Sequence, residues 1–204
     1  METKKDNTEE KILAAATNVF VVKGMDGARM QEIADEAGIN KALLHYYFRS
    51  KERLFEAIFG KVIQFAFPKI TQIAKSDMDF VTKLDLVIDA YIELLRTHPF
   101  IPGFVLKELN RDPSGLFKLV VKFGLNPQVI IDQIEAAMDK GEIIRMDPRH
   151  LGMNIISMCV FPFAAKPVLQ FILFRENPET LDQFYAERAE VIKQFVKNAI
   201  VIKK

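Results

Sequence analysis

Basic and hydroxyl-bearing side chains crowd one short stretch of this 204-residue chain, between Gly38 and Arg53. They are Lys41, His45, Tyr46, Tyr47, Arg49, Lys51 and Arg53. The stretch holds four Lys or Arg residues against the single acid Glu52, which leaves a local charge of +3. Ammonium, guanidinium and phenol groups donate hydrogen bonds to phosphate oxygens and to the edges of nucleic-acid bases. The chemistry that this stretch favours is therefore recognition of a polyanion.

Catalytic and metal-binding chemistry have no comparable support in the sequence. The three histidines share no metal-ligand spacing with one another or with Cys159. No nucleophile elbow, phosphate loop or dinucleotide-binding glycine pattern occurs. Two acidic pairs, Asp85 with Asp89 and Glu135 with Asp139, are spaced four apart, but such pairs are more often solvated surface than acid–base machinery. We expect no catalytic residue, no metal and no cofactor, and the protein is not expected to be an enzyme.

Two short helices joined by a tight turn are expected to position the basic stretch. Gly38 is predicted to end the first helix, because glycine adopts the left-handed conformation of a helix C-terminus without steric cost. Asn40 is predicted to cap the second helix, whose Leu44 and Phe48 face inward. The second helix of such a helix-turn-helix enters the major groove of DNA. A packed helical hairpin is the competing interpretation, but the turn length, the small residue Ala42 and the clustered charge together favour DNA binding.

Two longer strings carry a family resemblance. Residues 38–55 read GINKALLHYYFRSKERLF. This string resembles the signature of the TetR family of bacterial transcriptional regulators, which has Gly, a cap residue, Lys, a small residue, an aromatic-rich end and then Ser-Lys-Glu. Residues 12–34 read ILAAATNVFVVKGMDGARMQEIA, which is similar to the family's first helix, its Gly-containing loop and the start of its second helix. The resemblance covers roughly the first 60 residues, and beyond them only the helical layout agrees.

Two departures from the family pattern bear on DNA contact. Ala28 and Arg29 stand where the family usually has Thr or Ser capping the second helix, which makes Arg29 the expected substitute for a phosphate-bonding hydroxyl. Leu43 stands where many members have Thr or Ala, and its apolar side chain suits a thymine methyl group. The residues expected to contact DNA are Arg29, Gln31, Asn40, Lys41, Ala42, Leu43, His45, Tyr46, Tyr47 and Lys51. Tyr47 and Lys51 are expected to contact phosphate, since polar groups at the edge of the motif set its register on the backbone.

Composition limits where an attraction to DNA can arise. The net charge is +1, and the first 60 residues hold nine Lys or Arg against ten Asp or Glu, so no basic field covers the chain. Cys159 is the only cysteine, which excludes an internal disulfide and favours a reducing compartment. The N-terminus lacks signal-peptide character, and polar residues and prolines interrupt the apolar run from Met153 to Phe174. A cytoplasmic protein with no membrane partner is expected.

An all-α fold of two domains follows from the helical spacing of apolar residues. Residues 1–50 are expected to form an N-terminal helix-turn-helix DNA-binding domain. Residues 51–204 are expected to form a C-terminal all-helical effector-binding and dimerisation domain, with the helix from residue 51 linking the two. That linking helix is expected to end at Pro68. Asn-Pro or Asp-Pro pairs open three later helices, and Pro162 and Pro167 are expected to kink the most apolar one.

The second domain is where a small molecule is expected to bind. Its methionines and aromatic residues suit adaptable apolar walls, and the family resemblance implies an inducer site in this domain. The residues expected to line it are Phe65, Phe67, Tyr91, Phe104, Phe117, Phe123, Met138, Met158 and Phe161. For any one of these residues alone, the filling of an ordinary core is the better interpretation. The expected partner is an unidentified lipophilic or aromatic ligand.

The last two helices are too apolar for the surface of a monomer. The family resemblance implies a symmetric homodimer with two helices from each subunit, and a self-contained core is the alternative. The interface is expected to include Met153, Phe174, Phe184, Val191 and Phe195. In such a dimer, two recognition helices about 34 Å apart read successive major grooves.

Three functional hypotheses follow. The first is a transcriptional regulator that binds double-stranded operator DNA, a repressor released by an apolar or aromatic small-molecule ligand. The second is a sequence-tolerant architectural DNA-binding protein without an effector. The third and weakest is a small-molecule-binding or enzymatic helical protein whose helix-turn-helix is incidental.

Overall fold

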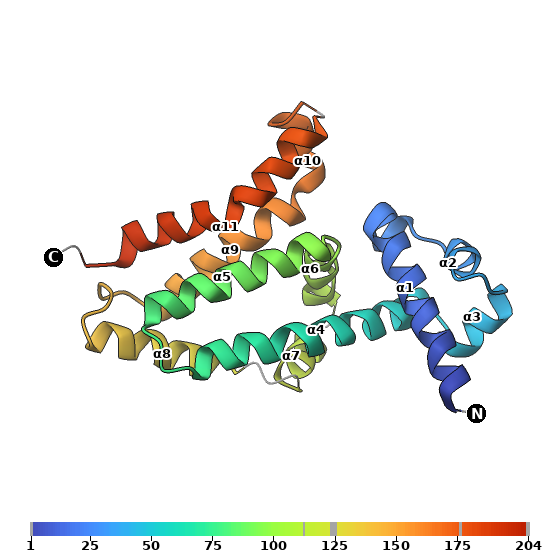
Figure 1. Ribbon diagram of the computed structural model, residues 1–204, viewed down its shortest axis with the longest axis horizontal. Coiled ribbons are helices and arrows are strands. Elements are labelled where there is room, and N and C mark those ends of the chain that lie inside the picture. Colours follow the sequence, from blue (N-terminus) through green and yellow to red (C-terminus); the bar gives the residue numbers. More distant parts are fainter. Residues whose placement is uncertain (1, 112, 123–125, 176, 203–204) are drawn as a thin grey trace. The chain divides into compact units, whose positions relative to one another are not determined.

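Every regular element in the described part of the chain is a helix (Figure 1). The computed structural model describes residues 2–111, 113–122, 126–175 and 177–202. Among these residues, β-type pairing is confined to an isolated bridge between Ile143 and Val201. The all-α fold expected from the sequence is confirmed.

The chain divides into two compact parts, unit 1 (Met1–Phe65) and unit 2 (Ala66–Lys204). The division lies inside helix α4 (Lys51–Lys75), later than the boundary after residue 50 that the sequence suggested. The first turns of α4 are packed into the core of unit 1, which explains the difference. Phe55 is fully buried there, and its ring centroid lies 5.5 Å from that of Phe20.

Unit 1 is built from α1 (Glu2–Gly27), α2 (Met30–Glu36), α3 (Lys41–Tyr47) and the start of α4. The backbone of α1 leaves helical geometry at Gly24, with φ of 67° and ψ of 171°. Side chains from all four helices fill the core. Those with no exposed area are Ile12, Ala16, Phe20, Ile33, Ala34, Leu44, Leu54 and Phe55. This shared core fixes α2 and α3 on α1.

Helix α4 does not end at Pro68, so that expectation was wrong. A proline inside a helix removes one backbone hydrogen bond, yet α4 continues to Lys75. Contacts from other helices hold the last turns. Ile73 is buried, and the carbonyl oxygen of Ala74 accepts hydrogen bonds from Lys83 Nζ at 3.2 Å and Gln133 Nε2 at 2.9 Å. Tertiary packing therefore outweighs the local effect of the proline.

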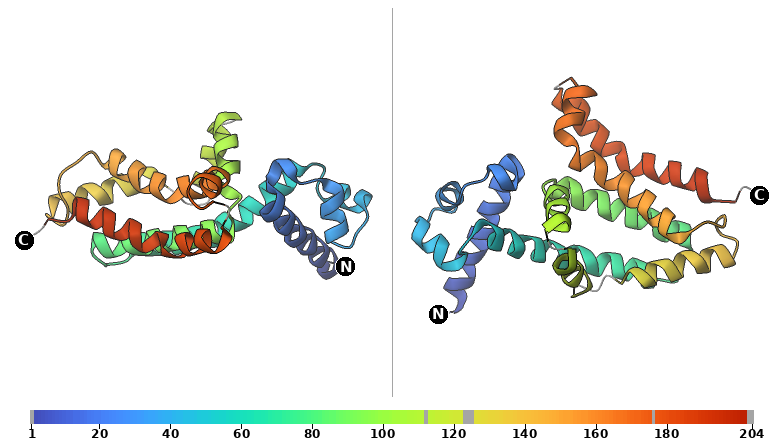
Figure 2. Two further views of the ribbon diagram at one scale, coloured as in Figure 1. Left: turned by 90° about the horizontal axis from the view of Figure 1, so that it is seen from above. Right: turned by 180° about the vertical axis from the view of Figure 1, so that it is seen from behind.

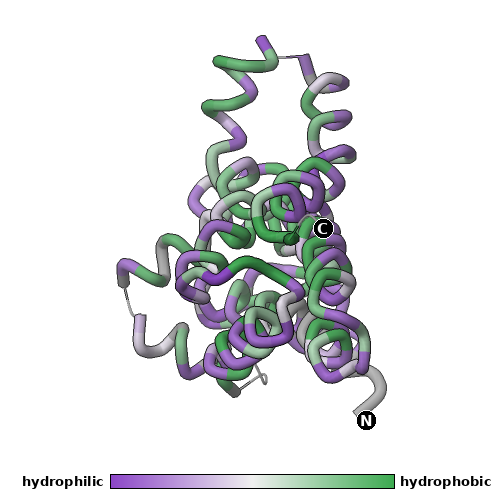
Figure 3. Tube along the Cα trace, turned by 90° about the vertical axis from the view of Figure 1, so that its left-hand side faces the viewer, coloured by the Kyte–Doolittle hydropathy of each residue, from purple (hydrophilic) through white to green (hydrophobic). Residues whose placement is uncertain are grey.

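The remaining helices belong to unit 2, where α5, α9 and α11 lie side by side (Figure 2). They are α5 (Phe80–Thr97), α6 (Ile101–Arg111), α7 (Pro113–Lys122), α8 (Pro127–Asp139), α9 (Pro148–Ala164), α10 (Lys166–Ile172) and α11 (Pro178–Ile200). Hydrophobic and hydrophilic residues alternate around their turns, as expected for helices with one buried face (Figure 3). The predicted Asn-Pro and Asp-Pro openings are confirmed, because Asn126, Asp147 and Asn177 each accept a backbone hydrogen bond from their helix.

A sharp bend of 71° separates α9 from α10. Pro167 accounts for it, since proline has no N–H with which to bond the carbonyl of Phe163 one turn earlier. Pro162, by contrast, stays inside α9 without breaking it. No single helix in the described residues is both long enough and apolar enough to cross a membrane, and α9 with α10 meets that test only as this bent pair.

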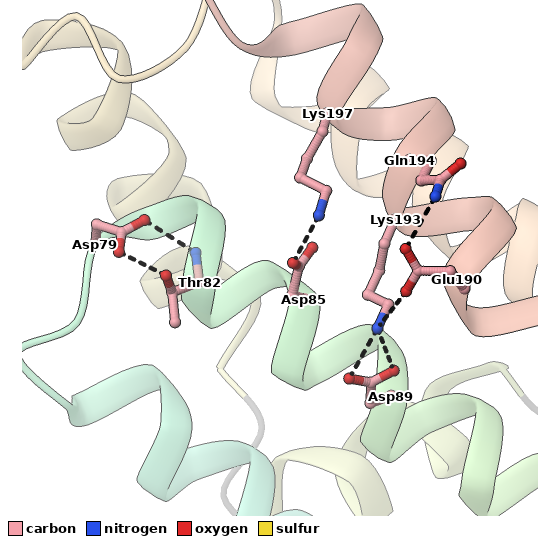
Figure 4. Close-up of polar contacts among 8 residues, drawn as sticks. All are labelled: Asp79, Thr82, Asp85, Asp89, Glu190, Lys193, Gln194 and Lys197. Carbon is pink, nitrogen blue, oxygen red and sulfur yellow. Dashed lines mark hydrogen bonds and ion pairs between the residues drawn. The ribbon is translucent and has the colours of Figure 1, made fainter.

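Ion pairs fasten α11 to α5 across the centre of unit 2 (Figure 4). Lys197 Nζ lies 2.9 Å from Asp85 Oδ2, and Lys193 Nζ lies 3.0 Å from Asp89 Oδ1. The hydrogen bond to Asp89 raises the pKa of Lys193. The acidic pair that the sequence suggested to be solvated surface therefore holds two helices in register, one turn apart on each.

The thiol of Cys159 is expected to be almost inert in the folded protein. Cys159 is 1% exposed in the core of unit 2, and burial raises its pKa to about 11. Because the thiolate is the reactive form, the native protein should react with a thiol-specific chromogenic disulfide at least about a hundredfold slower than the unfolded chain. Absorbance recorded with and without denaturant measures both rates. Equal rates would contradict the buried position of Cys159.

Candidate DNA-recognition surface

The turn between α2 and α3 has the geometry that its sequence predicted. Gly38 has a φ of 66°, in the left-handed region that favours glycine. The N–H of Ile39 donates to the carbonyl of Ala34 at 3.0 Å, which closes the end of α2. Asn40 Oδ1 accepts from the N–H of Leu43 at 2.8 Å and so caps α3. The two helices form a helix-turn-helix.

Helix α3 has one buried side and one exposed side. Leu44 has no exposed area, and Phe48 just beyond the helix is buried with it. The exposed residues are Lys41, Ala42, Leu43, His45 and Tyr46, and Tyr47 is half-buried. Tyr46 is 72% exposed, and its ring and that of Tyr47 pack edge to face with 5.5 Å between centroids. The protein thus presents the apolar side chain of Leu43 and the partly apolar side chain of Tyr46 beside a lysine and a histidine.

Helix α2 begins without a side-chain hydroxyl at its cap. The N–H of Arg29 instead donates to Glu32 Oε2 at 3.3 Å, so the third residue of the helix satisfies the cap backbone. Glu32 also accepts from Lys23 Nζ at 3.0 Å, and this hydrogen bond lowers the pKa of Glu32. Glu32 was not singled out in the sequence, although its spacing from Arg29 is that of a capping box. The exposed Arg29 stays a predicted phosphate contact. Gln31, whose Nε2 donates to Asp35 Oδ1 at 2.7 Å, stays a predicted DNA contact.

Lys51 has a structural role that sequence reasoning missed. Its Nζ donates to the carbonyl oxygens of Asp26 at 3.2 Å and Ala28 at 3.1 Å. These carbonyls lie at the end of α1 and in the loop before α2, where backbone acceptors lack helical partners. The partners lie 23 and 25 residues earlier in the chain, so no local pattern could reveal them. An ammonium has a third hydrogen, and the phosphate contact expected of Lys51 stays a prediction beside this role.

Replacing Lys51 with Met is expected to lower the free energy of unfolding by about 1–3 kcal/mol, because two carbonyls lose a charged donor. Urea denaturation followed by circular dichroism measures the change. Lys61→Met is the matched control, since Lys61 is exposed on the same helix. Equal stability of the two variants would contradict the structural role.

The predicted phosphate contact of Lys51 has a separate readout. If Lys51 also reaches DNA, the plot of log affinity against log salt concentration should become shallower by roughly one unit in Lys51→Met. Fluorescence anisotropy with a labelled duplex measures this slope. An unchanged slope would remove Lys51 from the DNA contacts and leave only its role in the loop.

Of the residues expected to bind a small molecule, Phe65 is the last residue of unit 1 and the others belong to unit 2. Phe123 lies outside the described residues, and of Phe65, Phe67 and Phe104 only the backbone, in α4 and α6, is described. Tyr91 and Met158 pack partly buried against the core, and burial raises the pKa of Tyr91 to about 12. Met138 is buried in the core, whereas Phe117 and Phe161 are 58% and 63% exposed. A site formed by these residues stays a prediction.

Described residues of unit 2 line two clefts large enough for a small molecule and a further one of about 80 Å³. One, of about 530 Å³, lies between α4, α5 and α11, and the other, of about 440 Å³, lies where α9 meets α10. None of the described residues expected to bind the ligand lines either cleft. Both clefts are lined by charged and apolar side chains together. His, Cys, Asp and Glu side chains in the described chain form no group of three or more able to hold a metal ion.

The residues expected at a dimer interface fall into two groups. Met153 on α9 and Val191 and Phe195 on α11 are exposed, by 62%, 51% and 65%. Phe174 and Phe184 instead pack against their own core, with 5.2 Å between their ring centroids. Other large apolar side chains exposed on α9, α10 and beyond α11 are Ile156, Phe161, Val168, Phe171, Ile172 and Ile202. Helices α9 and α11 therefore expose more apolar surface than a solvated pair requires, and the homodimer stays a prediction.

Comparison with known proteins bears on the helix-turn-helix directly. Residues 12–58 match the family described as bacterial regulatory proteins, tetR family. This range contains the cap at Asn40, the whole of α3 and the start of α4. Residues 12–58 are a DNA-binding domain of the TetR family.

The similarity to known proteins extends beyond this domain. The probable HTH-type transcriptional regulator YttP of Bacillus subtilis is 22% identical over 198 residues, or 95% of this chain and 94% of YttP. The HTH-type transcriptional activator FasR of Mycolicibacterium smegmatis is 30% identical over 91 residues, or 45% of this chain and 42% of FasR. The ketosteroid transcriptional regulator KstR2 of Mycobacterium tuberculosis shares the fold, with a TM-score of 0.69 at 16% identity over 96% of this chain and 95% of that structure.

These likenesses settle the general activity. The chain is a DNA-binding transcriptional regulator and not an enzyme. Its DNA-binding element is the helix-turn-helix of α2 and α3, which lies within the matched residues.

Proposed function

We propose that the chain is a transcriptional repressor that binds operator DNA as a homodimer and is released by a small molecule bound in unit 2. The observation that carries the DNA-binding part is the exposed side of α3. It presents Lys41, Ala42, Leu43 and Tyr46 while Leu44 is fully buried. A small residue near the helix N-terminus lets the backbone approach the bases, and the flanking donors suit phosphate and base edges.

Specific binding by α3 requires two copies. One helix contacts only a few base pairs, so a single half-site supplies a small part of the affinity of a typical operator complex. The exposed apolar residues of α9 and α11 support the pairing, because burying them between two copies would remove large side chains such as Phe195 from water. A twofold axis through this interface would relate two recognition helices, which predicts an inverted-repeat operator.

Control by a ligand is supported by the division of the chain. Unit 1 holds the recognition helix, unit 2 holds a separate core, and α4 is the element that belongs to both. We infer an apolar or aromatic effector from the methionine and aromatic content of unit 2, in which Tyr91 and Met158 lie partly buried at the edge of the core. Coupling of this kind commonly amounts to about 1–3 kcal/mol and must be reciprocal.

The deciding experiment is selection of bound fragments from genomic DNA, followed by footprinting of the bound fragments. A repressor or an activator should protect discrete inverted repeats upstream of genes. Indiscriminate binding would instead support the architectural protein without an effector, and no binding would defeat both.

Repression and effector release need their own readouts. Transcription from a promoter carrying the footprinted site should fall when the chain is expressed, whereas a rise would make it an activator, as FasR is named to be. For release, compounds that raise the melting temperature are titrated with and without the operator duplex. Equal affinities in the two titrations would show that the compound does not control DNA binding.

A further inference from the structure

One cleft of unit 2 lies at the break between α9 and α10. Its volume is about 440 Å³, within the range of small-molecule sites. Residues that line it include Glu93, Arg96, Phe163, Lys166, Asp182 and Tyr185. They come from the end of α5, the end of α9, the first residue of α10 and the first turns of α11. The bend that precedes Pro167 is what places Lys166 at this cleft.

The aromatic wall of the cleft is rigid before any ligand binds. The rings of Phe163 and Tyr185 stack with 4.5 Å between centroids and an interplanar angle of 22°. Both residues are buried: Phe163 is 4% exposed and Tyr185 is 6% exposed. The hydroxyl of Tyr185 donates to the carbonyl of Pro162 at 2.9 Å, which fixes the ring. A cleft with a fixed wall loses little conformational entropy on binding.

The cleft carries equal numbers of positive and negative side chains, and these make few close ion pairs with one another. Arg96 Nη1 lies 3.8 Å from Glu93 Oε2, a long contact between two exposed groups that contributes little. Within the described residues, neither Lys166 nor Asp182 has an ion-pair partner. The cleft therefore offers two cations and two carboxylates to an incoming molecule.

We propose that this cleft binds a small zwitterion with the size and charges of a free amino acid. Its carboxylate pairs with Arg96 and Lys166, and its ammonium pairs with Glu93 and Asp182. A ligand with a single charge would be attracted by either the two cations or the two carboxylates and repelled by the other two groups. The lining therefore selects for a ligand that carries both charges. The site is distinct from the aromatic residues expected to bind an apolar effector, and it goes beyond the proposed control of DNA binding.

The test uses the full chain without DNA, so that its outcome is independent of the proposed repressor function. Each of the standard L-amino acids is added at about 10 mM, a concentration that detects millimolar binding, and the shift in melting temperature is recorded. The best of them is then compared by calorimetry with two analogues of the same side chain, one lacking the ammonium and one lacking the carboxylate. The amino acid should bind at least about tenfold more tightly than either analogue. No shift with any amino acid, or equal binding of an analogue, would overturn the proposal.

Two variants assign the charges. Lys166→Gln should weaken binding of the amino acid by about tenfold and leave binding of the carboxylate-free analogue unchanged. Asp182→Asn should also weaken binding of the amino acid by about tenfold, but leave binding of the ammonium-free analogue unchanged. Lys118→Gln and Asp132→Asn are the matched controls, since both residues are exposed and neither lines the cleft. Melting of each variant without ligand checks that the fold is intact. Equal losses in variants and controls would show that the effect is one of general charge and would overturn the site.

Discussion

Phe195→Glu is expected to turn the protein into a monomer that has lost specific affinity for operator DNA. The side chain of Phe195 is 65% exposed, and Val191 lies one turn before it on the same side of α11. In a twofold interface the substitution places two carboxylates in apolar surroundings, and an unpaired buried charge costs several kcal/mol. Losing one of two half-sites should weaken operator binding by at least about a hundredfold.

Sedimentation velocity at micromolar concentration measures the assembly, and anisotropy with an operator duplex measures the affinity. Phe117→Glu is the matched control, because Phe117 is 58% exposed on α7 and should leave the dimer intact. Phe184→Glu would be a poorer test, although Phe184 was also expected at the interface. The ring of Phe184 packs on Phe174, and the guanidinium carbon of Arg188 lies over it, 5.7 Å from the ring centroid. The substitution would therefore damage the fold itself. A monomeric unmodified protein, or a dimeric Phe195→Glu variant, would defeat the proposed interface.

Ala42→Leu is expected to remove most of the sequence preference of the protein while leaving the fold intact. Ala42 is exposed in the first turn of α3, and leucine is nearly as good a helix former as alanine. The larger side chain would hold the helix away from the base edges, where the contacts that distinguish sequences are made. Operator affinity should fall by about a hundredfold, toward the affinity for unrelated DNA.

Competition between operator and unrelated duplexes measures the preference, and thermal melting checks the fold. Ala14→Leu provides the matched control, since Ala14 is exposed on α1 in the same unit. If Ala42→Leu bound the same operator with unchanged affinity, the exposed side of α3 would not be the reading surface.

Local sequence determined the elements that recognise DNA. Gly38 and Asn40 act through the conformation of one residue and one short-range hydrogen bond, and both are found as their residue types predict. The Asn-Pro and Asp-Pro openings of α8, α9 and α11 work in the same way. The periodicity of apolar residues was sufficient to place Leu44 on the buried side and Tyr46 on the exposed side of α3, because each helix turn repeats the same geometry.

Tertiary structure decided what depends on residues distant in the sequence. Pro68 ends no helix because Ile73 and the bonds to Ala74 hold the turns beyond it. Lys51 bonds carbonyls more than 20 residues earlier in the chain, at separations of 23 and 25. Whether an aromatic residue of unit 2 is buried, partly buried or exposed depends on which other helix it packs against. The cleft beside Lys166 likewise forms only when α9, α10 and α11 are packed together. Short-range geometry is written in the sequence, whereas the choice of long-range partners is made by the packing of whole helix faces.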